Sequence, residues 1–101
     1  MGTILPTTTA AYNTERAIVN TSIRANWQDY ADALMDFAFD DLIGDDADAS
    51  NATYYGDGVH PTDAGYARMG LYAAAALAQA MVTTSGGGGA GGGVFGGAVI
   101  R

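Results

Sequence analysis

The sequence predicts an α/β fold, and three observations support that prediction. Residues 2–6 (GTILP) are a short apolar segment that proline terminates, which is typical of the end of a strand. A helical pattern follows it, and residues 33–39 (ALMDFAF) form a second apolar run soon afterwards. Strand–helix–strand alternation indicates a βαβ unit. A helix that continues from Trp27 through residues 33–39 is the alternative for the second run.

The first helix is expected to begin near Thr14, because Asn13 or Thr14 can cap it and Glu15 complements the helix dipole in its first turn. Large apolar residues recur on one face at helical spacing. They are Val19, Ile23 and Trp27, with Ile18 and Tyr30 beside them. Polar residues such as Arg16 and Asn20 fall mostly on other faces. We therefore expect a surface helix whose apolar face packs on something larger.

An acidic, glycine-punctuated loop spans residues 40–58, and a second helix is expected over residues 62–81. Thr62 is its expected N-cap, and Asp63 lies in its first turn. The alanine-rich body of this segment has high helix propensity. Small side chains would let such a helix lie close against a neighbouring layer.

The end of the chain differs sharply in composition. Residues 84–101 are rich in glycine and are expected to form a flexible tail, outside a single domain of residues 1–83. The apolar part of this tail, residues 94–100, has the alternative of docking as a strand on a partner.

The composition excludes several classes of function. At 101 residues the chain makes at most one domain. Eleven acidic residues against four basic ones leave a formal net charge of -7, which argues against nucleic acid because phosphate binding needs clustered Lys and Arg. The absence of cysteine excludes disulfides and thiolate metal sites. The sequence has neither a membrane-spanning apolar run nor a secretory signal, so we expect a soluble protein of undetermined location.

The residues with catalytic potential lie in residues 54–70 (YYGDGVHPTDAGYARMG), which contain the single histidine of the chain. A histidine acting as a general base needs a defined tautomer, which a carboxylate on its other ring nitrogen provides. Asp57 lies three residues before His60, in a glycine-flanked turn that permits such a contact. Pro61 favours extended backbone at His60. The motif predicts an Asp–His pair, and a surface or capping histidine is the alternative.

The same stretch resembles the last sequence block of the SGNH hydrolases, also called GDSL esterases and lipases. In that family a D-G-V-H-P-T stretch, a G-Y pair and a small-residue helix carry the catalytic Asp and His. Residues 3–8 (TILPTT), 20–24 (NTSIR) and 33–39 are similar, less specifically, to a late strand, its following helix and the next strand. The resemblance covers about residues 2–82. It implies the C-terminal part of a flavodoxin-like, three-layer α/β/α sandwich with a parallel sheet.

By this resemblance Asp57 would orient His60, and His60 would be the general base toward a serine. Tyr54 and Tyr55 lie close enough in sequence to line a substrate pocket. The serine, glycine and asparagine blocks that supply the family's nucleophile and oxyanion hole are absent. None of the three serines lies on a predicted strand-to-helix turn, where a nucleophile would be presented: they are Ser22, Ser50 and Ser85.

The resemblance therefore implies the Asp- and His-bearing part of a serine esterase that acts through an acyl-enzyme, without a cofactor. The substrate would be a small ester, a lipid or an acetylated carbohydrate. The isolated chain is expected to be inactive and to need an N-terminal half, a partner chain or self-association. A non-catalytic structural or assembly module, of a viral or surface particle, is the alternative from another class.

Two patterns of possible metal ligands lie in this region, and a solvated acidic loop is the alternative to both. One is an EF-hand-like spacing of Asp46, Asp48, Ser50 and Asp57. However, Asn51 replaces the turn glycine of that motif and Asp57 replaces its bidentate glutamate. The other combines Asp57, His60 and Asp63 as ligands. Because Asp63 is better explained as a first-turn helix carboxylate, we expect no metal.

Overall fold

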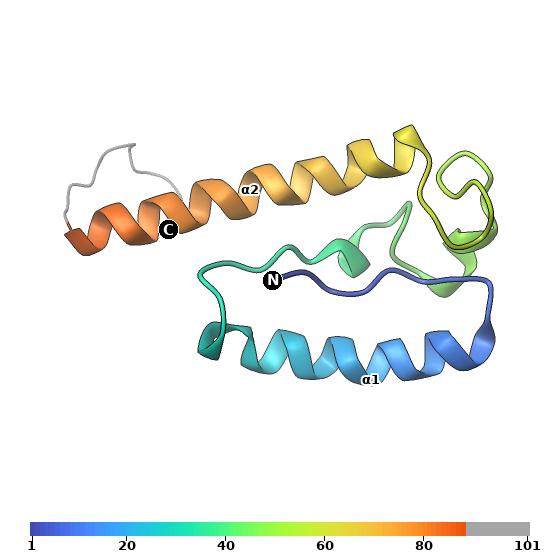
Figure 1. The fold of residues 1–101 in the computed structure, drawn as a ribbon, viewed down its shortest axis with the longest axis horizontal. Coiled ribbons are helices and arrows are strands. Elements are labelled where there is room, and N and C mark those ends of the chain that lie inside the picture. The colour runs from blue at the N-terminus through green and yellow to red at the C-terminus, as the bar shows by residue number, and fades with distance from the viewer. Residues whose placement is uncertain (89–101) are drawn as a thin grey trace.

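The computed structural model describes residues 1–88 as two long helices on opposite sides of a thin middle layer (Figure 1). Helix α1 is Ala10–Asn26 and helix α2 is Asp63–Gly88. Two extended segments, around Gly2 and Met35, form the middle layer. Three short 3-10 helices complete the regular structure: Trp27–Asp29, Phe37–Phe39 and Asp46–Ser50.

The predicted α/β class, with its parallel sheet and α/β/α sandwich, is wrong for residues 1–88, which form no sheet. Pairing between the two extended segments is limited to one isolated parallel bridge, Gly2 to Met35. The second segment turns into a 3-10 helix at Phe37, so it cannot extend the ladder. Helix continuation through residues 33–39 is also wrong, because α1 ends at Asn26 and gives way to a 3-10 turn.

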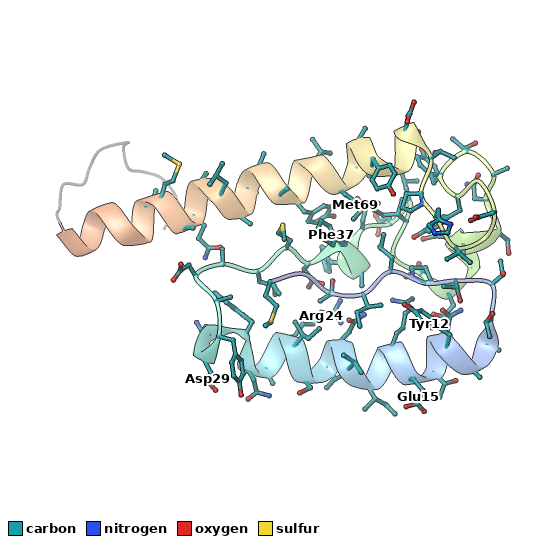
Figure 2. All side chains as sticks on the ribbon, viewed as in Figure 1. Tyr12, Glu15, Arg24, Asp29, Phe37 and Met69 are labelled. Atoms are coloured by element: carbon teal, nitrogen blue, oxygen red, sulfur yellow. The ribbon has the colours of Figure 1, made fainter. Side chains whose placement is uncertain are left out.

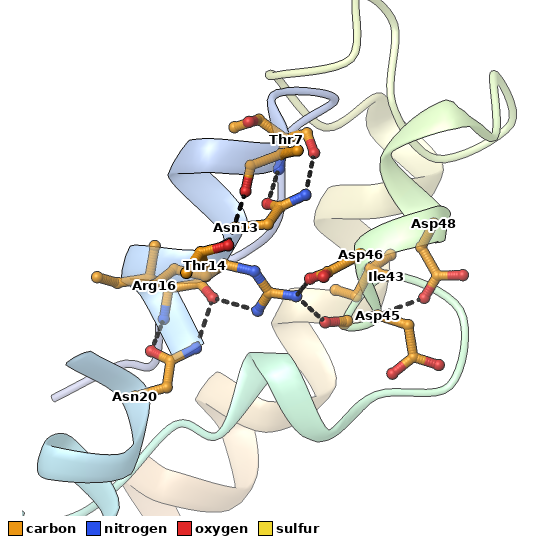
Figure 3. A network of polar contacts seen from close by, with 12 residues as sticks. Thr7, Asn13, Thr14, Arg16, Asn20, Ile43, Asp45, Asp46 and Asp48 are labelled. Atoms are coloured by element: carbon orange, nitrogen blue, oxygen red, sulfur yellow. Dashed lines mark hydrogen bonds and ion pairs between the residues drawn. The ribbon is translucent and has the colours of Figure 1, made fainter. Parts of the chain in front are cut away.

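Side chains of α1 replace a neighbouring strand along the first segment. The Asn20 amide accepts a hydrogen bond from the Ile4 N–H (2.7 Å) and donates one to the Ile4 carbonyl (2.9 Å). The Asn13 amide does the same at Thr7, with distances of 2.9 and 2.7 Å (Figure 3). An adjacent strand would make the same pair of bonds. The backbone groups of residues 4 and 7 are therefore satisfied without a sheet.

Arg16 completes this polar face of α1. Its guanidinium donates to the Ile4 carbonyl at 3.0 Å, the Gly44 carbonyl at 2.8 Å and the Asp46 carboxylate at 2.8 Å (Figure 3). The Arg16 side chain is only 8% exposed. One arginine therefore joins α1 to both the first extended segment and the acidic loop.

Helix α1 buries polar side chains and leaves part of its apolar face exposed. Buried positions of α1 are Asn13, Arg16 and Asn20, whereas Ile18 is 63% exposed and Val19 is 42% exposed. The expectation that the apolar face would pack on the rest of the protein is therefore wrong for Ile18, Val19 and Tyr30, whereas Ile23 and Trp27 of that face are half-buried. Helical spacing identified which residues share a face, but hydrogen bonding to the extended segment decided which face is buried.

The helix limits also differ from those predicted. Helix α1 begins at Ala10 after Thr9, because the Asn13 side chain binds Thr7 instead of capping a later start. Helix α2 continues to Gly88, so it crosses the predicted boundary between residues 83 and 84. The rest of the predicted tail, residues 89–101, lies outside the described residues.

Helix α2 is joined to the middle layer by a buried carboxylate. Asp40 accepts hydrogen bonds from Arg68 (2.6 Å to a terminal nitrogen), from the Tyr72 hydroxyl (3.1 Å) and from the Leu42 N–H (2.8 Å). Burial alone would raise the pKa of Asp40, but these bonds outweigh it and hold the pKa below its ordinary value. An aromatic contact accompanies the ion pair: the Phe37 ring of the middle layer (Figure 2) meets the Tyr72 ring of α2 edge-on, with ring centroids 6.3 Å apart.

Removing the Asn20 amide should destabilise the protein. Asn20→Ala leaves the part-buried Ile4 N–H without its partner, which should cost about 1 kcal/mol, the low end of the range for an unsatisfied group. Urea unfolding followed by circular dichroism measures the loss. Asn26→Ala is the matched control, because Asn26 is exposed and bonds only to Ser22 within α1, so it should change stability by less than about 0.5 kcal/mol. Equal effects of the two substitutions would contradict the role of Asn20.

The Asp40 ion pair should make stability sensitive to acid. Because the pKa of folded Asp40 lies below its ordinary value of 3.8, its stabilisation is complete above that pH and is lost as the pH falls toward the lowered value. Asp40→Asn should therefore lower the urea midpoint most at neutral pH, and the difference should shrink below pH 3.8. Asp41→Asn, at the exposed neighbouring residue, is the control. A difference that stays constant with pH would refute this assignment.

Candidate acid–base site at Asp57 and His60

The structure brings Asp57 and His60 into direct contact. Asp57 Oδ2 lies 2.7 Å from Nδ1 of the His60 ring. The other carboxylate oxygen, Oδ1, accepts hydrogen bonds from the backbone N–H of Val59 (2.9 Å) and of His60 (2.7 Å). Three bonds therefore fix the carboxylate, and they also fold residues 57–60 into a tight turn.

This arrangement keeps Asp57 ionised and fixes the tautomer of a neutral His60 ring. The His60 backbone bond, then the His60 ring bond, then the Val59 N–H bond hold the pKa of Asp57 well below its usual range. An ionised carboxylate only accepts hydrogen bonds, so Nδ1 of a neutral ring must carry the proton and Nε2 presents its lone pair. No described side chain among residues 1–82 forms a hydrogen bond with Nε2, and the His60 side chain is 74% exposed. The imidazole can therefore accept a proton from an outside group.

The turn is held against the first loop of the chain. The Thr8 N–H donates to the Gly58 carbonyl at 3.0 Å. Gly58 has a φ of +81°, and a Cβ at this position would lie 2.8 Å from atoms of the Thr8 side chain. Glycine is therefore required both by the backbone conformation and by the close approach of Thr8. The sequence indicated that Gly58 permits a tight turn. The residues around Thr8 give no indication that Thr8 contacts a residue fifty positions away.

The start of α2 closes the other side of the turn. The Gly56 N–H donates to the His60 carbonyl at 3.0 Å, and the Thr62 N–H donates to the Tyr54 carbonyl at 2.9 Å. The Thr62 hydroxyl accepts from the Gly65 N–H at 3.3 Å, which confirms Thr62 as a cap of this helix. Gly65 is needed here because a Cβ would lie 2.4 Å from the Tyr54 carbonyl oxygen.

The two tyrosines proposed as pocket residues have different surroundings. Tyr55 is 2% exposed, and its hydroxyl donates to the Ile43 carbonyl. Burial, and next the nearby Asp48 carboxylate, raise the pKa of Tyr55 to about 12. Tyr54 is half-buried. Tyr55 therefore supports the turn from inside the protein, and of the two only Tyr54 presents a partly exposed side chain.

No serine partner for His60 is found within residues 1–88. The Asp57–His60 turn lies at the end of the molecule where α1 and α2 begin (Figure 1). Ser22 lies near the opposite end of α1, where its Oγ is 3.5 Å from the Asn26 amide nitrogen. Ser85 lies near the far end of α2, and Ser50 closes the 3-10 helix of the acidic loop. No hydrogen bond joins His60 to any hydroxyl among residues 1–82, whose side chains the structure describes.

Substitution of Gly58 should loosen the turn. Gly58→Ala places a Cβ in the left-handed region, which costs about 1–2 kcal/mol, and against Thr8. Thermal unfolding should show lower stability, and adding Thr8→Ala should recover part of it. Gly70→Ala is the control: nothing lies within 4 Å of its new Cβ, so it should stabilise α2 by about 0.5–1 kcal/mol. Unchanged stability in Gly58→Ala would contradict this packing.

Comparison with protein-family models, with curated proteins and with solved structures found no match for this chain. Within residues 1–88 no three His, Asp or Glu side chains come together as a metal site. No helix in the same part of the chain is long and apolar enough to cross a bilayer. The functional interpretation therefore depends on the geometry of the Asp57–His60 turn and on the sequence block that contains it.

Proposed function

We propose that Asp57 and His60 are the acid–base pair of a serine ester hydrolase of the SGNH type. The observation that carries the proposal is the 2.7 Å contact between Asp57 Oδ2 and His60 Nδ1, with Nε2 open to solvent. A pair built this way suits acyl transfer, because the carboxylate orients the ring and stabilises the imidazolium that forms. The D-G-V-H-P-T block that holds both residues adds independent support.

In the proposed reaction, Nε2 of His60 removes the proton from a serine hydroxyl as its oxygen attacks the carbonyl carbon of an ester. The tetrahedral intermediate collapses when His60 returns that proton to the leaving alcohol, which leaves an acyl-serine. Water then attacks the acyl carbon, His60 again accepting and returning one proton, and the carboxylic acid departs. Asp57 stays ionised throughout, which agrees with its lowered pKa.

The serine in this scheme belongs to a polypeptide segment other than residues 1–88. His60 has no hydroxyl partner among the side chains described for residues 1–82, Ser85 lies near the far end of α2, and the serine, glycine and asparagine blocks of the family are absent from the sequence. A complementary segment would need to supply the nucleophile and the oxyanion hole. Suitable substrates are small esters, including acetylated carbohydrates, because the half-buried Tyr54 beside the turn offers an aromatic surface to them.

Complementation tests this proposal. The chain alone should not hydrolyse p-nitrophenyl acetate faster than its His60→Ala variant. It should gain activity when co-expressed with an SGNH hydrolase segment that carries the serine, glycine and asparagine blocks but lacks its own Asp–His block. In the complemented protein, His60→Ala and Asp57→Asn should each lower the rate by about 10²–10⁴-fold.

Asp63→Asn is the matched control, because this exposed carboxylate in the first turn of α2 has no role in the scheme. Its rate should stay within about twofold of the parent, as expected for a surface residue. Activity of the chain alone that depends on His60 would refute the need for an outside serine. A complemented protein that is active but insensitive to His60→Ala would refute the acid–base role.

A non-catalytic assembly role is the second candidate, and one observation favours it. The apolar face of α1 is exposed, and acid–base chemistry at the other end of the helix does not use it. In that case complementation would yield no His60-dependent activity, and the Asp57–His60 contact would serve only to hold the turn.

A further inference from the structure

An open apolar groove of about 290 Å³ runs along the exposed side of α1. Aliphatic and aromatic side chains dominate its lining: Met1, Ile18, Val19, Ile23, Trp27 and Tyr30. Tyr30 is 77% exposed and Ile18 is 63% exposed. Contiguous apolar surface of this kind is uncommon on a protein that acts alone, and it marks interaction sites.

The groove is separate from the Asp57–His60 turn. Its aromatic end, at Trp27 and Tyr30, lies beyond the C-terminal end of α1, whereas the turn lies beside the N-terminal end (Figure 1). Helix α1 binds the rest of the chain through the face that carries Asn13, Arg16 and Asn20. The groove on its other side is therefore left unoccupied within residues 1–88.

Acidic side chains stand at both ends of the groove. Glu15 precedes Val19 by four residues, about one helical turn, and Asp29 lies between Trp27 and Tyr30 in the sequence. Figure 2 shows Glu15 and Asp29 near opposite ends of the side of α1 that faces away from the middle layer. Neither carboxylate has an ion-pair partner among residues 1–88. Positive charge is scarce there, because the Arg24 guanidinium on α1 is bound by Asp36 and the amino group of Met1 donates to the Ala33 carbonyl.

These charges select among the partners that could cover the groove. A second copy is disfavoured, because two antiparallel α1 helices would bring Glu15 of one copy toward Asp29 of the other, and each copy carries a net charge of -7. An anionic membrane surface is disfavoured for the same reason. A partner with apolar residues flanked by basic ones matches both features of the surface.

We propose that this groove binds an amphipathic helix of a partner protein, with apolar residues at helical spacing and Lys or Arg at both ends of its apolar face. From Ile18 to Trp27 the groove is about 14 Å long, which corresponds to between two and three helical turns. Partner residues spaced i, i+4 and i+7 would fill it, in the helix-in-groove mode of recognition. Their flanking cations would reach Glu15 and Asp29.

Trp27 is the single tryptophan of the chain and lies in the groove, so its fluorescence reports occupancy directly. The probe is a synthetic amphipathic peptide of Leu and Lys, about four helical turns long. Titration into the full chain should give a saturable change in Trp27 emission that weakens with added salt. A peptide with Glu in place of Lys, and one with Ser in place of Leu, should each bind at least about tenfold more weakly.

Substitutions on the surface of α1 test whether the peptide binds in the groove. Val19→Asp should weaken binding of the Leu/Lys peptide at least about tenfold, while Glu15→Gln with Asp29→Asn should weaken it severalfold and reduce its salt dependence. Leu71→Asp, at an exposed position on α2, is the control and should bind like the parent. Circular dichroism verifies that each variant is folded, since all four positions are on the surface.

Three results would overturn the proposal. One is binding of the Leu/Lys peptide that Val19→Asp does not weaken. Another is equal binding of the Lys and Glu peptides. The third is concentration-dependent self-association of the chain, measured by sedimentation and abolished by Val19→Asp, which would assign the groove to a second copy.

Discussion

Two asparagine side chains hold the first segment of this protein in place. Asn13 and Asn20 each accept from a backbone N–H and donate to the carbonyl of the same residue, at Thr7 and Ile4. Buried backbone groups must be hydrogen-bonded, and in an extended segment a neighbouring strand usually does this. Here the side chains of a helix supply these hydrogen bonds, so the extended segment is stable within residues 1–88 without a sheet around it.

The candidate acid–base turn depends on that attachment. Asn13 fixes Thr7, the next residue Thr8 binds the Gly58 carbonyl, and Gly58 lies beside Asp57. The second support comes from Thr62, the cap of α2, whose backbone N–H donates to the Tyr54 carbonyl. The turn is therefore fixed from both helices, while the His60 ring itself stays exposed. A rigid base beneath a solvent-facing imidazole is what general-base chemistry requires.

Sequence reasoning succeeded where the determinants are local. The Asp57–His60 contact follows from three residues of separation, flanking glycines and a following proline, and the structure contains it. Thr62 as a helix cap was predicted for the same kind of reason. The predicted parallel sheet was wrong, and local sequence does not reveal that the Ile4 backbone pairs with the Asn20 side chain, sixteen residues away, in place of a strand. The prediction of which face of α1 is buried was wrong, because periodicity shows which residues share a face but not which face contacts the rest of the protein.

The most direct test of this account is amide hydrogen exchange along the first segment. The Ile4 and Thr7 N–H groups donate to asparagine side chains, whereas the Leu5 N–H between them has no partner within residues 1–88. The account predicts that Ile4 and Thr7 exchange slowly, Leu5 exchanges fast, and Asn20→Ala removes the protection at Ile4. Equal, fast exchange at all three amides would contradict the central role of the two asparagines.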